Sequence, residues 1–282
     1  MFDQIQKRAL ESLLAEDDPK TKQLVVDQLC ANPAEKYQSV MQEFSRSAND
    51  RVRECALEIL SRWGCGTSRM ELFLRAIRQN PWESWEDLER FSWDLCEFER
   101  GRFDKKTYST CLDEWAARVQ RIVPADANAT RRILALRQVL GQEEGFRGNV
   151  DDYYHPDNSY LDTVIDDRRG LPLTVTLVYV FVGRRLGWDV CGIGVPSHYI
   201  GGLDRVLFDP FHGGVLIDEA QTLAHFKIHN PECDCLHLFK STPYETAKRI
   251  MANLLKAYAL VEDEERCKRI NQALEELLAA RK

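Results

Sequence analysis

The chain has 282 residues, which is enough for one large domain or two domains of modest size. Its 45 acidic residues outnumber its 38 Lys and Arg residues, so its net charge of −7 argues against nucleic acid or an anionic membrane as a partner. The nine cysteines are scattered and odd in number, and we expect them to be reduced thiols in a cytoplasmic protein rather than a disulfide framework.

The N-terminal region, residues 1–80, is predicted to be wholly helical. It begins without the apolar core of a signal peptide. The residues around 50–57 resemble the second helix of a HEAT repeat, although such an array needs about three units to bury its faces. We therefore expect a helical cap on the main domain, with a partner-docking surface as the alternative. Apolar residues recur at three- and four-residue spacing in five segments, residues 3–14, 19–30, 34–45, 50–63 and 69–79.

Residues 81–128 are predicted to form a helical connecting segment that is rich in tryptophan. Such a cluster can form a peptide groove, but large aromatic side chains more often form core that joins one domain to the next, and we expect the second arrangement. A further helix over residues 129–140 leads into the part of the chain with most motifs. The tryptophans concerned are Trp82, Trp85, Trp93 and Trp115.

An almost unbroken apolar run predicts a central helix over residues 172–186, with only Thr174 and Thr176 as small polar breaks. Pro172 stands where the first turn of a helix tolerates proline, and Gly187 follows the last turn. A helix that is apolar almost all round belongs inside a domain. The run is too short to cross a membrane, and no other stretch is longer, so no membrane partner is expected.

A predicted hairpin follows the central helix and brings His198 and Asp209 together. With Leu203 and Asp204 as the two loop residues, counting outward places His198 directly opposite Asp209. Directly opposed residues point to the same face with Cβ atoms roughly 4.5–5.5 Å apart, close enough for a hydrogen bond between imidazole and carboxylate. This register is an assumption, because a slip of one residue would put the two side chains on opposite faces.

A buried helix that points its N-terminus at a hairpin bearing His and Asp is the arrangement of the Cys-His-Asp triad in papain-like and transglutaminase-like enzymes. The chain from about Leu72 to its C-terminus resembles the SirB family of transglutaminase-like proteins, which implies a transglutaminase-like core with helical extensions. The motifs that carry the resemblance are Phe146-Arg147-Gly148-Asn149, Asp151-Asp152-Tyr153-Tyr154, Asn158-Ser159-Tyr160-Leu161, Arg169-Gly170-Leu171-Pro172, Pro196-Ser197-His198 and Asp209-Pro210-Phe211-His212-Gly213-Gly214.

The start of the central helix departs from the active enzymes of this class. Their motif is Gly-x-Cys, whereas this chain has Gly170-Leu171-Pro172, and proline offers no nucleophile. The nearest hydroxyl is that of Thr174, where the SirB family commonly carries serine. His198 and Asp209 carry over from the triad and the cysteine does not, so acyl transfer through a thioester is not expected.

Four further residues are candidates for the lining of a cleft at this helix start. They are Asn158, Arg169, Pro172 and His212; the alternatives are a turn residue for Asn158, a solvated charge for Arg169 and a solvated turn histidine for His212. Cys191 is not expected to replace the missing nucleophile, because it lies on a predicted strand and lacks the electropositive surroundings of a reactive thiol.

The end of the chain is predicted to form two helices over residues 243–260 and 263–280. Thr242-Pro243-Tyr244-Glu245 combines an N-cap, a proline at the first helical position and a capping-box glutamate. The pair resembles the helical hairpin that closes SirB-type chains and is similar to a single tetratricopeptide unit. One such pair is expected to pack against the core rather than to form a binding array.

A cluster of possible zinc ligands precedes these helices. The Cys-x-Cys spacing differs from the usual zinc knuckle, and the first two histidines would need a helix to share a face. An ordinary loop with free cysteines is therefore expected, and neither a metal nor another cofactor is predicted. The five weak candidates are His225, His229, Cys233, Cys235 and His237.

The fold class expected from these elements is α+β, with a transglutaminase- or papain-like core in which a central buried helix packs on a small antiparallel sheet. A helical HEAT-like region is expected over residues 1–80 and a helical connecting segment over 81–128. The core is expected over residues 129–240, and a C-terminal helical pair over 241–282.

Two functional hypotheses follow. The first is a catalytically silent transglutaminase-like protein that binds a peptide or protein segment in the cleft near Pro172, His198 and Asp209. The alternative is a weak amide or ester hydrolase in which His198 and Asp209 activate water or the hydroxyl of Thr174, since general-base help contributes roughly 10²–10⁴-fold. A purely structural scaffold that uses the helical N-terminal region is the third possibility. For the His198–Asp209 pair itself, the structural alternative is a retained hydrogen bond that holds the hairpin.

Overall fold

The described part of the chain forms two compact units in the computed structural model. Unit 1 consists of Met1–Ala76 and Glu97–Phe103, and unit 2 consists of Ile77–Cys96 and Asp104–Lys282. The residues that the structure describes are 4–16, 18–31, 34–63, 69–101, 104–195, 198–218, 220, 223 and 240–280.

Unit 1 is helical, and the five helices predicted from hydrophobic spacing are confirmed to within one residue at each end. Side-chain caps set two of the helix starts: the side chain of Asp18 accepts from the Thr21 N–H, and that of Asn49 accepts from the Arg51 N–H. The apolar faces of the first four helices meet in one core. The helices are α1 (Gln4–Leu14), α2 (Pro19–Cys30), α3 (Ala34–Phe44), α4 (Asp50–Arg62) and α5 (Arg69–Gln79), of which residues 77–79 of α5 are counted in unit 2.

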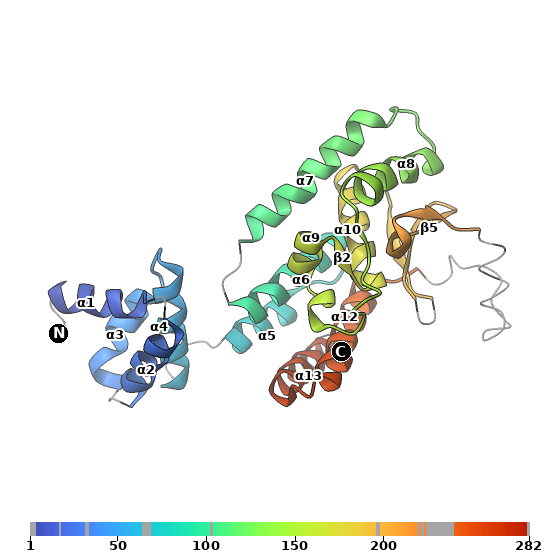
Figure 1. Ribbon diagram of the computed structural model, residues 1–282. Coiled ribbons are helices and arrows are strands. Elements are labelled where there is room, and N and C mark those ends of the chain that lie inside the picture. The colour runs from blue at the N-terminus through green and yellow to red at the C-terminus, as the bar shows by residue number, and fades with distance from the viewer. Residues whose placement is uncertain are drawn as a thin grey trace. The chain divides into compact units, whose positions relative to one another are not determined.

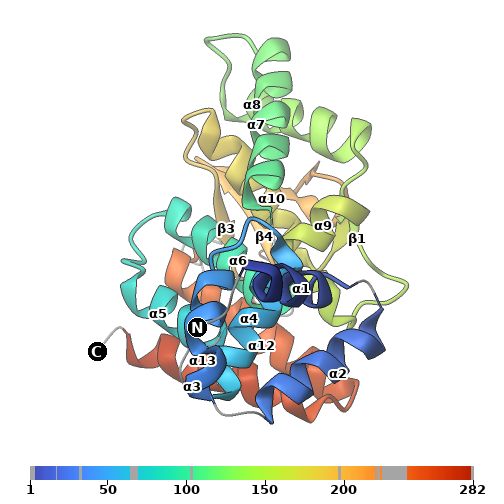
Figure 2. The ribbon, with the colours of Figure 1, turned by 90° about the vertical axis from the view of Figure 1, so that its left-hand side faces the viewer.

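Unit 2 combines helices with a small antiparallel sheet, which confirms the α+β class (Figures 1 and 2). Its helices are α6 (Trp85–Arg100), of which residues 97–100 are counted in unit 1, α7 (Lys105–Ile122), α8 (Ala129–Leu136), α9 (Leu161–Asp167), α10 (Pro172–Arg185), α12 (Pro243–Leu260) and α13 (Glu264–Ala279). Its sheet has the order β3 (Cys191–Ile193), β4 (Ile200–Leu203), β5 (Val206–Asp209) and β6 (Val215–Leu216). The short strands β1 (Arg147–Gly148) and β2 (Arg169–Gly170) form a separate parallel pair that was not predicted.

Helix α10 is the central element of unit 2, as predicted. Every residue from its first, Pro172, to Gly183 is buried, and the helix contacts α7, α9, the sheet and α12. The two polar residues in its apolar run satisfy their hydroxyls internally: Thr174 donates to the Asn158 carbonyl at 2.7 Å and Thr176 to the Pro172 carbonyl at 2.7 Å. Both threonine hydroxyls of the helix are therefore paired, whereas the buried hydroxyl of Tyr179, also in α10, has no hydrogen-bond partner among the described residues.

The C-terminal end of α10 is fixed by an ion pair with α6 and α7. The Arg185 guanidinium binds both carboxylate oxygens of Glu89 at 2.8 Å and donates from Nε to Asp113 at 2.6 Å. This pair lies beside Trp85 and Trp93 in an open cavity of about 710 Å³. All four tryptophans of the predicted cluster are at most 9% exposed and lie in unit 2. They are core residues, as expected.

The hairpin formed by β4 and β5 has a different register from the predicted one. Leu203 pairs with Val206, so the two loop residues are Asp204 and Arg205, not the residues one position earlier. Asp204 takes a positive φ of 53°, a conformation that aspartate tolerates better than leucine, which explains the shift. In the observed register each residue of β4 pairs with a residue of β5 that lies two positions further along the chain than predicted. Because that error is even, each side chain keeps its predicted face of the sheet.

Helices α12 and α13 confirm the predicted C-terminal pair, including the capping box of Thr242 and Glu245. Two hydroxyl contacts fix α12 to the rest of unit 2. Tyr258 bonds Tyr160 at 2.8 Å between hydroxyl oxygens, and Thr246 bonds the Tyr199 hydroxyl at 2.8 Å. Helix α12 is therefore anchored to the segment before α10 and to the segment that enters the sheet.

The predicted helix over residues 129–140 differs from the structure in its second half. Helix α8 ends at Leu136 and continues as a π-helix, η1 (Arg137–Glu143), in which the Glu144 N–H donates to the Val139 carbonyl. Gly141 of this π-helix lies so close to the Gly213 carbonyl that a Cβ at position 141 would be 2.1 Å from that oxygen. The π-helix thus rests against the loop that follows β5.

Candidate functional site

A His-Asp-His cluster lies at the end of the β4–β5 hairpin. Asp209, the last residue of β5, accepts hydrogen bonds on Oδ2 from His198 Nε2 at 2.9 Å and from His212 Nδ1 at 2.8 Å. Its other oxygen, Oδ1, accepts from the Phe211 N–H at 2.9 Å and caps the short 3₁₀ helix η3 (Pro210–His212). Asp209 is 8% exposed, so the carboxylate is the buried centre of the cluster.

The predicted hydrogen bond between His198 and Asp209 is present in the structure, although the strand register from which it was predicted was wrong. In the observed register Asp209 lies one pair beyond Gly201–Phe208, and His198 precedes β4. The two residues are therefore diagonal rather than directly opposed neighbours, and a histidine side chain reaches across that separation. Because the predicted register differs from the observed one by two residues, an even number, the prediction that the two side chains share a face of the sheet is still correct.

Electrostatics keep Asp209 ionised. Burial by itself raises the pKa of this carboxyl, but the hydrogen bonds and charges of His198 and then of His212 outweigh burial and hold the pKa of Asp209 below its usual value. An ionised carboxylate only accepts hydrogen bonds, so His198 donates from Nε2. In a neutral imidazole this leaves Nδ1 of His198 as the acceptor, which is the nitrogen available to act as a base.

The same three residues are a possible metal-ligand set. His198, Asp209 and His212 each offer a ligand atom, and these atoms lie within 4.8 Å of one another. Two imidazoles and a carboxylate suit zinc and other divalent transition metals. The weaker candidates predicted at His225, His229, Cys233, Cys235 and His237 lie outside the residues that the structure describes.

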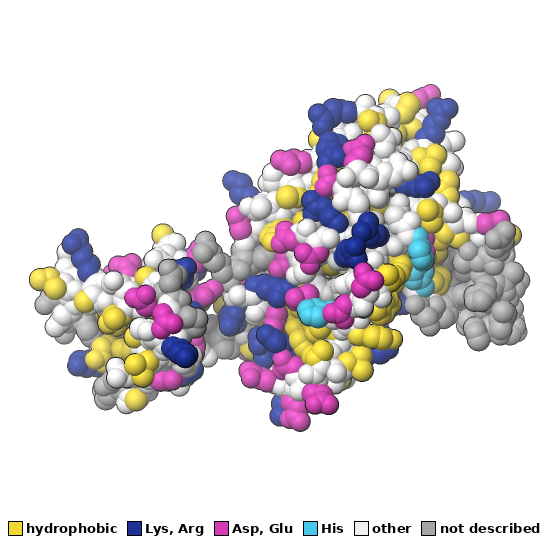
Figure 3. Space-filling model, viewed as in Figure 1, with side chains coloured by type: hydrophobic (Ala, Val, Ile, Leu, Met, Phe, Trp, Pro, Cys, Tyr) yellow, Lys and Arg dark blue, Asp and Glu magenta, His cyan; other side chains and the backbone are white. Residues whose placement is uncertain are grey.

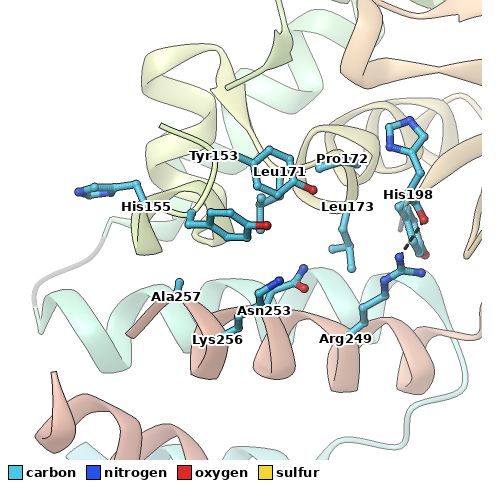
Figure 4. A pocket seen from close by; sticks show the side chains of 12 residues that line it. Tyr153, His155, Leu171, Pro172, Leu173, His198, Arg249, Asn253, Lys256 and Ala257 are labelled. Atoms are coloured by element: carbon cyan, nitrogen blue, oxygen red, sulfur yellow. Dashed lines mark hydrogen bonds between the residues drawn. The ribbon is translucent and has the colours of Figure 1, made fainter. Parts of the chain in front are cut away.

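A cavity of about 260 Å³ opens at the N-terminal end of α10, beside this cluster (Figure 4). Pro172, the residue expected at the position of the enzymes' cysteine, is the first residue of α10 and lines the cavity. His198 also lines it, and Figure 4 shows its imidazole pointing away from Arg249, whose guanidinium donates to the His198 carbonyl at 2.8 Å. The full lining is Tyr153, Tyr154, His155, Leu171, Pro172, Leu173, His198, Tyr199, Arg249, Asn253, Lys256 and Ala257.

The remaining predicted site residues lie outside this lining. Thr174 is 3% exposed and its hydroxyl donates to the Asn158 carbonyl. Arg169 forms an ion pair with Asp151 at 3.0 Å on the surface. His212 is hydrogen-bonded to Asp209 and its side chain is 64% exposed. Of the predicted residues, the cavity thus brings together Pro172 and His198.

Asn158 does not line the cavity but forms hydrogen bonds with the segments that do. Its side-chain amide donates to the carbonyls of Asp152 at 2.6 Å and Tyr153 at 3.0 Å, and its Oδ1 accepts from Asn149 at 2.9 Å. Its backbone carbonyl accepts from the Leu171 N–H at 3.2 Å. Asn158 therefore joins the loop that carries Tyr153 to the start of α10.

Replacing Asn158 by alanine is expected to destabilise the fold by about 1–3 kcal/mol, because the half-buried carbonyl groups of Asp152 and Tyr153 lose their donor and the Asn149 amide loses its acceptor. The free energy of unfolding from urea titration measures this change. The control is Arg169→Ala, which removes a solvent-exposed ion pair and is expected to cost at most about 1 kcal/mol. An Asn158→Ala variant as stable as the control would show that the amide does not hold the loop.

The wall formed by α12 was missed in the sequence. Arg249, Asn253 and Lys256 follow one another at spacings of four and three, so they share one face of the helix. This polar stripe runs beside the apolar face that packs on the core, and it was the available signal. The spacing alone did not say that the stripe faces Pro172, because that depends on how α12 docks.

Comparison with known proteins assigns the chain to a family. The family model of the transglutaminase-like superfamily matches residues 106–252, slightly more than half of the chain. The chain therefore belongs to the transglutaminase-like superfamily. That match extends from α7 to the part of α12 that carries Arg249.

Curated relatives are similar over part of their lengths. A UPF0162 protein of Xylella fastidiosa is 30% identical over 166 residues, 55% of this chain and 59% of that protein. A UPF0162 protein of Vibrio cholerae is 27% identical over 90 residues, 30% of this chain and 33% of that protein. F-box only protein 21 of Mus musculus is 36% identical over 66 residues, 23% of this chain and 10% of that protein. The chain thus spans about three fifths or less of these relatives.

No solved structure matches the chain significantly. Among the helices of the described residues, none combines the length and the apolar character that crossing a membrane requires.

Proposed function

We propose that this chain is a catalytically silent, SirB-type member of the transglutaminase-like superfamily that binds a peptide or protein segment at the start of α10. The single observation that carries the proposal is Pro172 in the position of the nucleophile, beside a His198–Asp209 pair that keeps its hydrogen bond at 2.9 Å. An enzyme that works through a thioester needs a thiol at this position, and proline supplies none.

The cavity supports binding in place of catalysis. It is lined by backbone and side chains from the loop at Tyr153, the start of α10 and the α12 wall, so three separate elements meet around one recess (Figure 4). Tyrosine, leucine and proline supply apolar contact, and Arg249 and Asn253 supply polar contact. A concave recess that combines apolar contact surface with polar groups fixed on different elements can orient a ligand. The cytoplasmic location expected from the cysteines is part of this proposal, and six cysteines of the described residues are free thiols.

Peptide selection tests the binding proposal directly. The full chain, immobilised, is expected to enrich peptides from a random display library. Asn253→Trp fills the cavity and is expected to abolish the enrichment, whereas Asn271→Trp places the same side chain on an exposed position of α13 and is expected to preserve it. The enriched peptides are expected to remain intact by mass spectrometry after incubation with the chain. Enrichment that survives Asn253→Trp would place binding elsewhere.

Restoring the nucleophile tests the catalytically silent part of the proposal. A Pro172→Cys variant is expected to carry a thiol of lowered pKa, because the N-terminus of α10 stabilises a thiolate. Its rate of alkylation by iodoacetamide is therefore expected to stay high below pH 8, where an unperturbed thiol slows down. The wild-type chain is the background, and burial raises the pKa of its Cys55, Cys96 and Cys191 thiols. A new thiol with an ordinary pH profile would contradict a preserved thiolate site.

Hydrolysis through water is the second candidate, and the contact between His198 Nε2 and Asp209 Oδ2 is the observation that favours it. The Nε2 bond to Asp209 leaves Nδ1 as a base. The Thr174 route is disfavoured because that hydroxyl is buried and already donates to the Asn158 carbonyl. Turnover of p-nitrophenyl acetate that is lost in His198→Ala would support the water route, and equal turnover in both chains would reject it.

A further inference from the structure

The charge of the cavity at the start of α10 has a single sign. Its lining holds the cations Arg249 and Lys256 and contains no aspartate or glutamate. The chain as a whole has the opposite balance, with 45 acidic and 38 basic residues. On the face viewed in Figure 3 the two signs are interspersed. A recess without carboxylates is therefore a local departure from the rest of the molecule.

Neither cation has an acidic partner within the described ranges. The Arg249 guanidinium donates from Nη2 to the carbonyls of His198 at 2.8 Å and Val195 at 3.3 Å, and it lies 5.3 Å from the ring of Tyr199. The Lys256 ammonium lies 4.7 Å from the ring of Tyr154. By contrast, Arg185 in the cavity beside Trp85 pairs with two carboxylates.

The position of Arg249 makes the absent charge significant. Burial is the largest influence on the pKa of the Arg249 guanidinium and lowers it from its ordinary value. A half-buried cation that has only neutral acceptors has lost hydration without gaining a counter-charge. A bound anion would restore that interaction and would be held by charge-assisted hydrogen bonds.

The start of α10 adds to the attraction for an anion. Leu171, Pro172 and Leu173 line the cavity, and they are the N-cap and the first two residues of the helix. Leu171 provides no side-chain cap. Pro172 has no N–H and the Leu171 N–H donates to the Asn158 carbonyl. The N–H of Leu173 is therefore the one that this lining offers. An N–H in the first turn without an intrahelical acceptor carries partial positive charge and favours a negative group. The positive end of α10 and the two cations of α12 therefore face one recess.

We propose that this cavity binds a carboxylate of the peptide segment, either an acidic side chain or the chain terminus, between Arg249, Lys256 and the start of α10. The proposal rests on the proposed peptide-binding function and names its ligand class. Tyr153 and Tyr154 contact the apolar part of the segment. Tyr153 lies 6.1 Å from Phe211 between ring centroids, and Phe211 lies 5.7 Å from the imidazole of His198, so aromatic rings connect the cavity with the His-Asp-His cluster.

Small anions test the cavity without a peptide. Sodium succinate is titrated at constant ionic strength into ¹⁵N-labelled full chain, and the backbone amides of Leu173 and Asn253 are followed by NMR. A saturable shift is expected, and Lys256→Met and Arg249→Met are each expected to weaken it about tenfold. Lys248→Met removes a cation from the same helix outside the lining and is expected to change the affinity less than about twofold. Shifts that do not saturate, or equal weakening by Lys248→Met, overturn the proposal.

Inorganic phosphate is the competing probe in the same titration. Binding of phosphate at least tenfold tighter than succinate would overturn the carboxylate assignment. The Arg249→Met variant also loses two hydrogen bonds to carbonyls, so Lys256→Met, on an exposed residue, is the variant on which the conclusion rests if Arg249→Met fails to fold.

The peptide selection separates this inference from the function on which it rests. Peptides enriched by the full chain are expected to contain Asp or Glu, or a free C-terminus, and to lose affinity when the carboxyl group is replaced by an amide. Enrichment of peptides without a required carboxylate would overturn this inference and leave the peptide-binding function standing. No enrichment, together with saturable succinate binding, would overturn the peptide as ligand and with it the proposed function.

Discussion

Replacing Gly141 by alanine is expected to lower the free energy of unfolding by about 1–3 kcal/mol and to disturb the His-Asp-His cluster. The new methyl group would lie 2.1 Å from the Gly213 carbonyl oxygen and 2.9 Å from the Tyr179 hydroxyl. The first of these neighbours is backbone, so it cannot give way by rotating. Gly213 follows His212 directly, and its displacement therefore moves the loop that carries the cluster.

Two measurements are needed for Gly141→Ala, urea unfolding and the NMR signals of the His198 and His212 rings. The control is Gly187→Ala, where φ is +71° and no atom lies within 4 Å of the added Cβ. That variant pays for a strained backbone, on the order of 1 kcal/mol, without touching the loop. Only Gly141→Ala is expected to shift the histidine signals. Unchanged histidine signals in a destabilised Gly141→Ala variant would show that the π-helix does not position the site.

Replacing Asp209 by asparagine is expected to cost about 2–3 kcal/mol of stability at pH 7, because hydrogen bonds from His198, His212 and the Phe211 N–H lose their charged acceptor. Asparagine keeps the size of the side chain, so loss of packing is not the cause. The control is Asp204→Asn in the turn of the same hairpin, which is expected to change stability by less than about 0.5 kcal/mol.

The cost of Asp209→Asn is expected to depend on pH. The pKa of Asp209 is lowered in the folded chain, so the unfolded chain binds the proton more readily. The stability that the ionised carboxylate contributes is therefore fully present above the ordinary aspartate pKa of about 3.9 and is lost as pH falls through the lowered value. Urea unfolding of both chains at pH 7, 5 and 3.5 is expected to show a difference that narrows only at the lowest pH. A constant difference would contradict an ionised Asp209 as the source of the stability.

These two predictions concern the supports of the cluster, whereas the variants of Arg249, Lys256 and Asn253 concern the cavity. The first set of variants tests what stabilises the fold, and the second set tests which residues bind the ligand. Asp209→Asn is expected to weaken the fold and to alter the position of His198. The cavity is expected to keep its shape, because the Tyr160–Tyr258 and Tyr199–Thr246 hydrogen bonds hold α12 in place. Binding of succinate by folded Asp209→Asn is the corresponding comparison.

Hydrophobic spacing and end signals in the sequence were sufficient for most of the helices. Helix α10 was found from its apolar run, with Pro172 at its start and Gly187 beyond its end. The capping box at Thr242 located the start of α12. These features are local, because each depends on residues within a turn or two of one another. They can therefore be predicted without knowledge of the rest of the chain.

The hairpin shows where local information became insufficient. The pairing of His198 with Asp209 was predicted from the pleat, because side chains alternate between faces with a period of two. The register itself was wrong, since it depends on which residue tolerates a positive φ, and Asp204 does so in this turn. The prediction of the pair survived because the error was even.

The amino-acid sequence by itself determined most of the helices, the α+β class, the proline at the start of α10 and the shared face of His198 and Asp209. Only the tertiary structure placed Arg249, Asn253 and Lys256 opposite the start of α10, and only it set Gly141 against Gly213. The physical reason is range. Helix ends and strand faces follow from neighbours along the chain, whereas a cavity wall follows from how a helix docks, which is fixed by contacts such as Tyr160–Tyr258 between residues 98 positions apart.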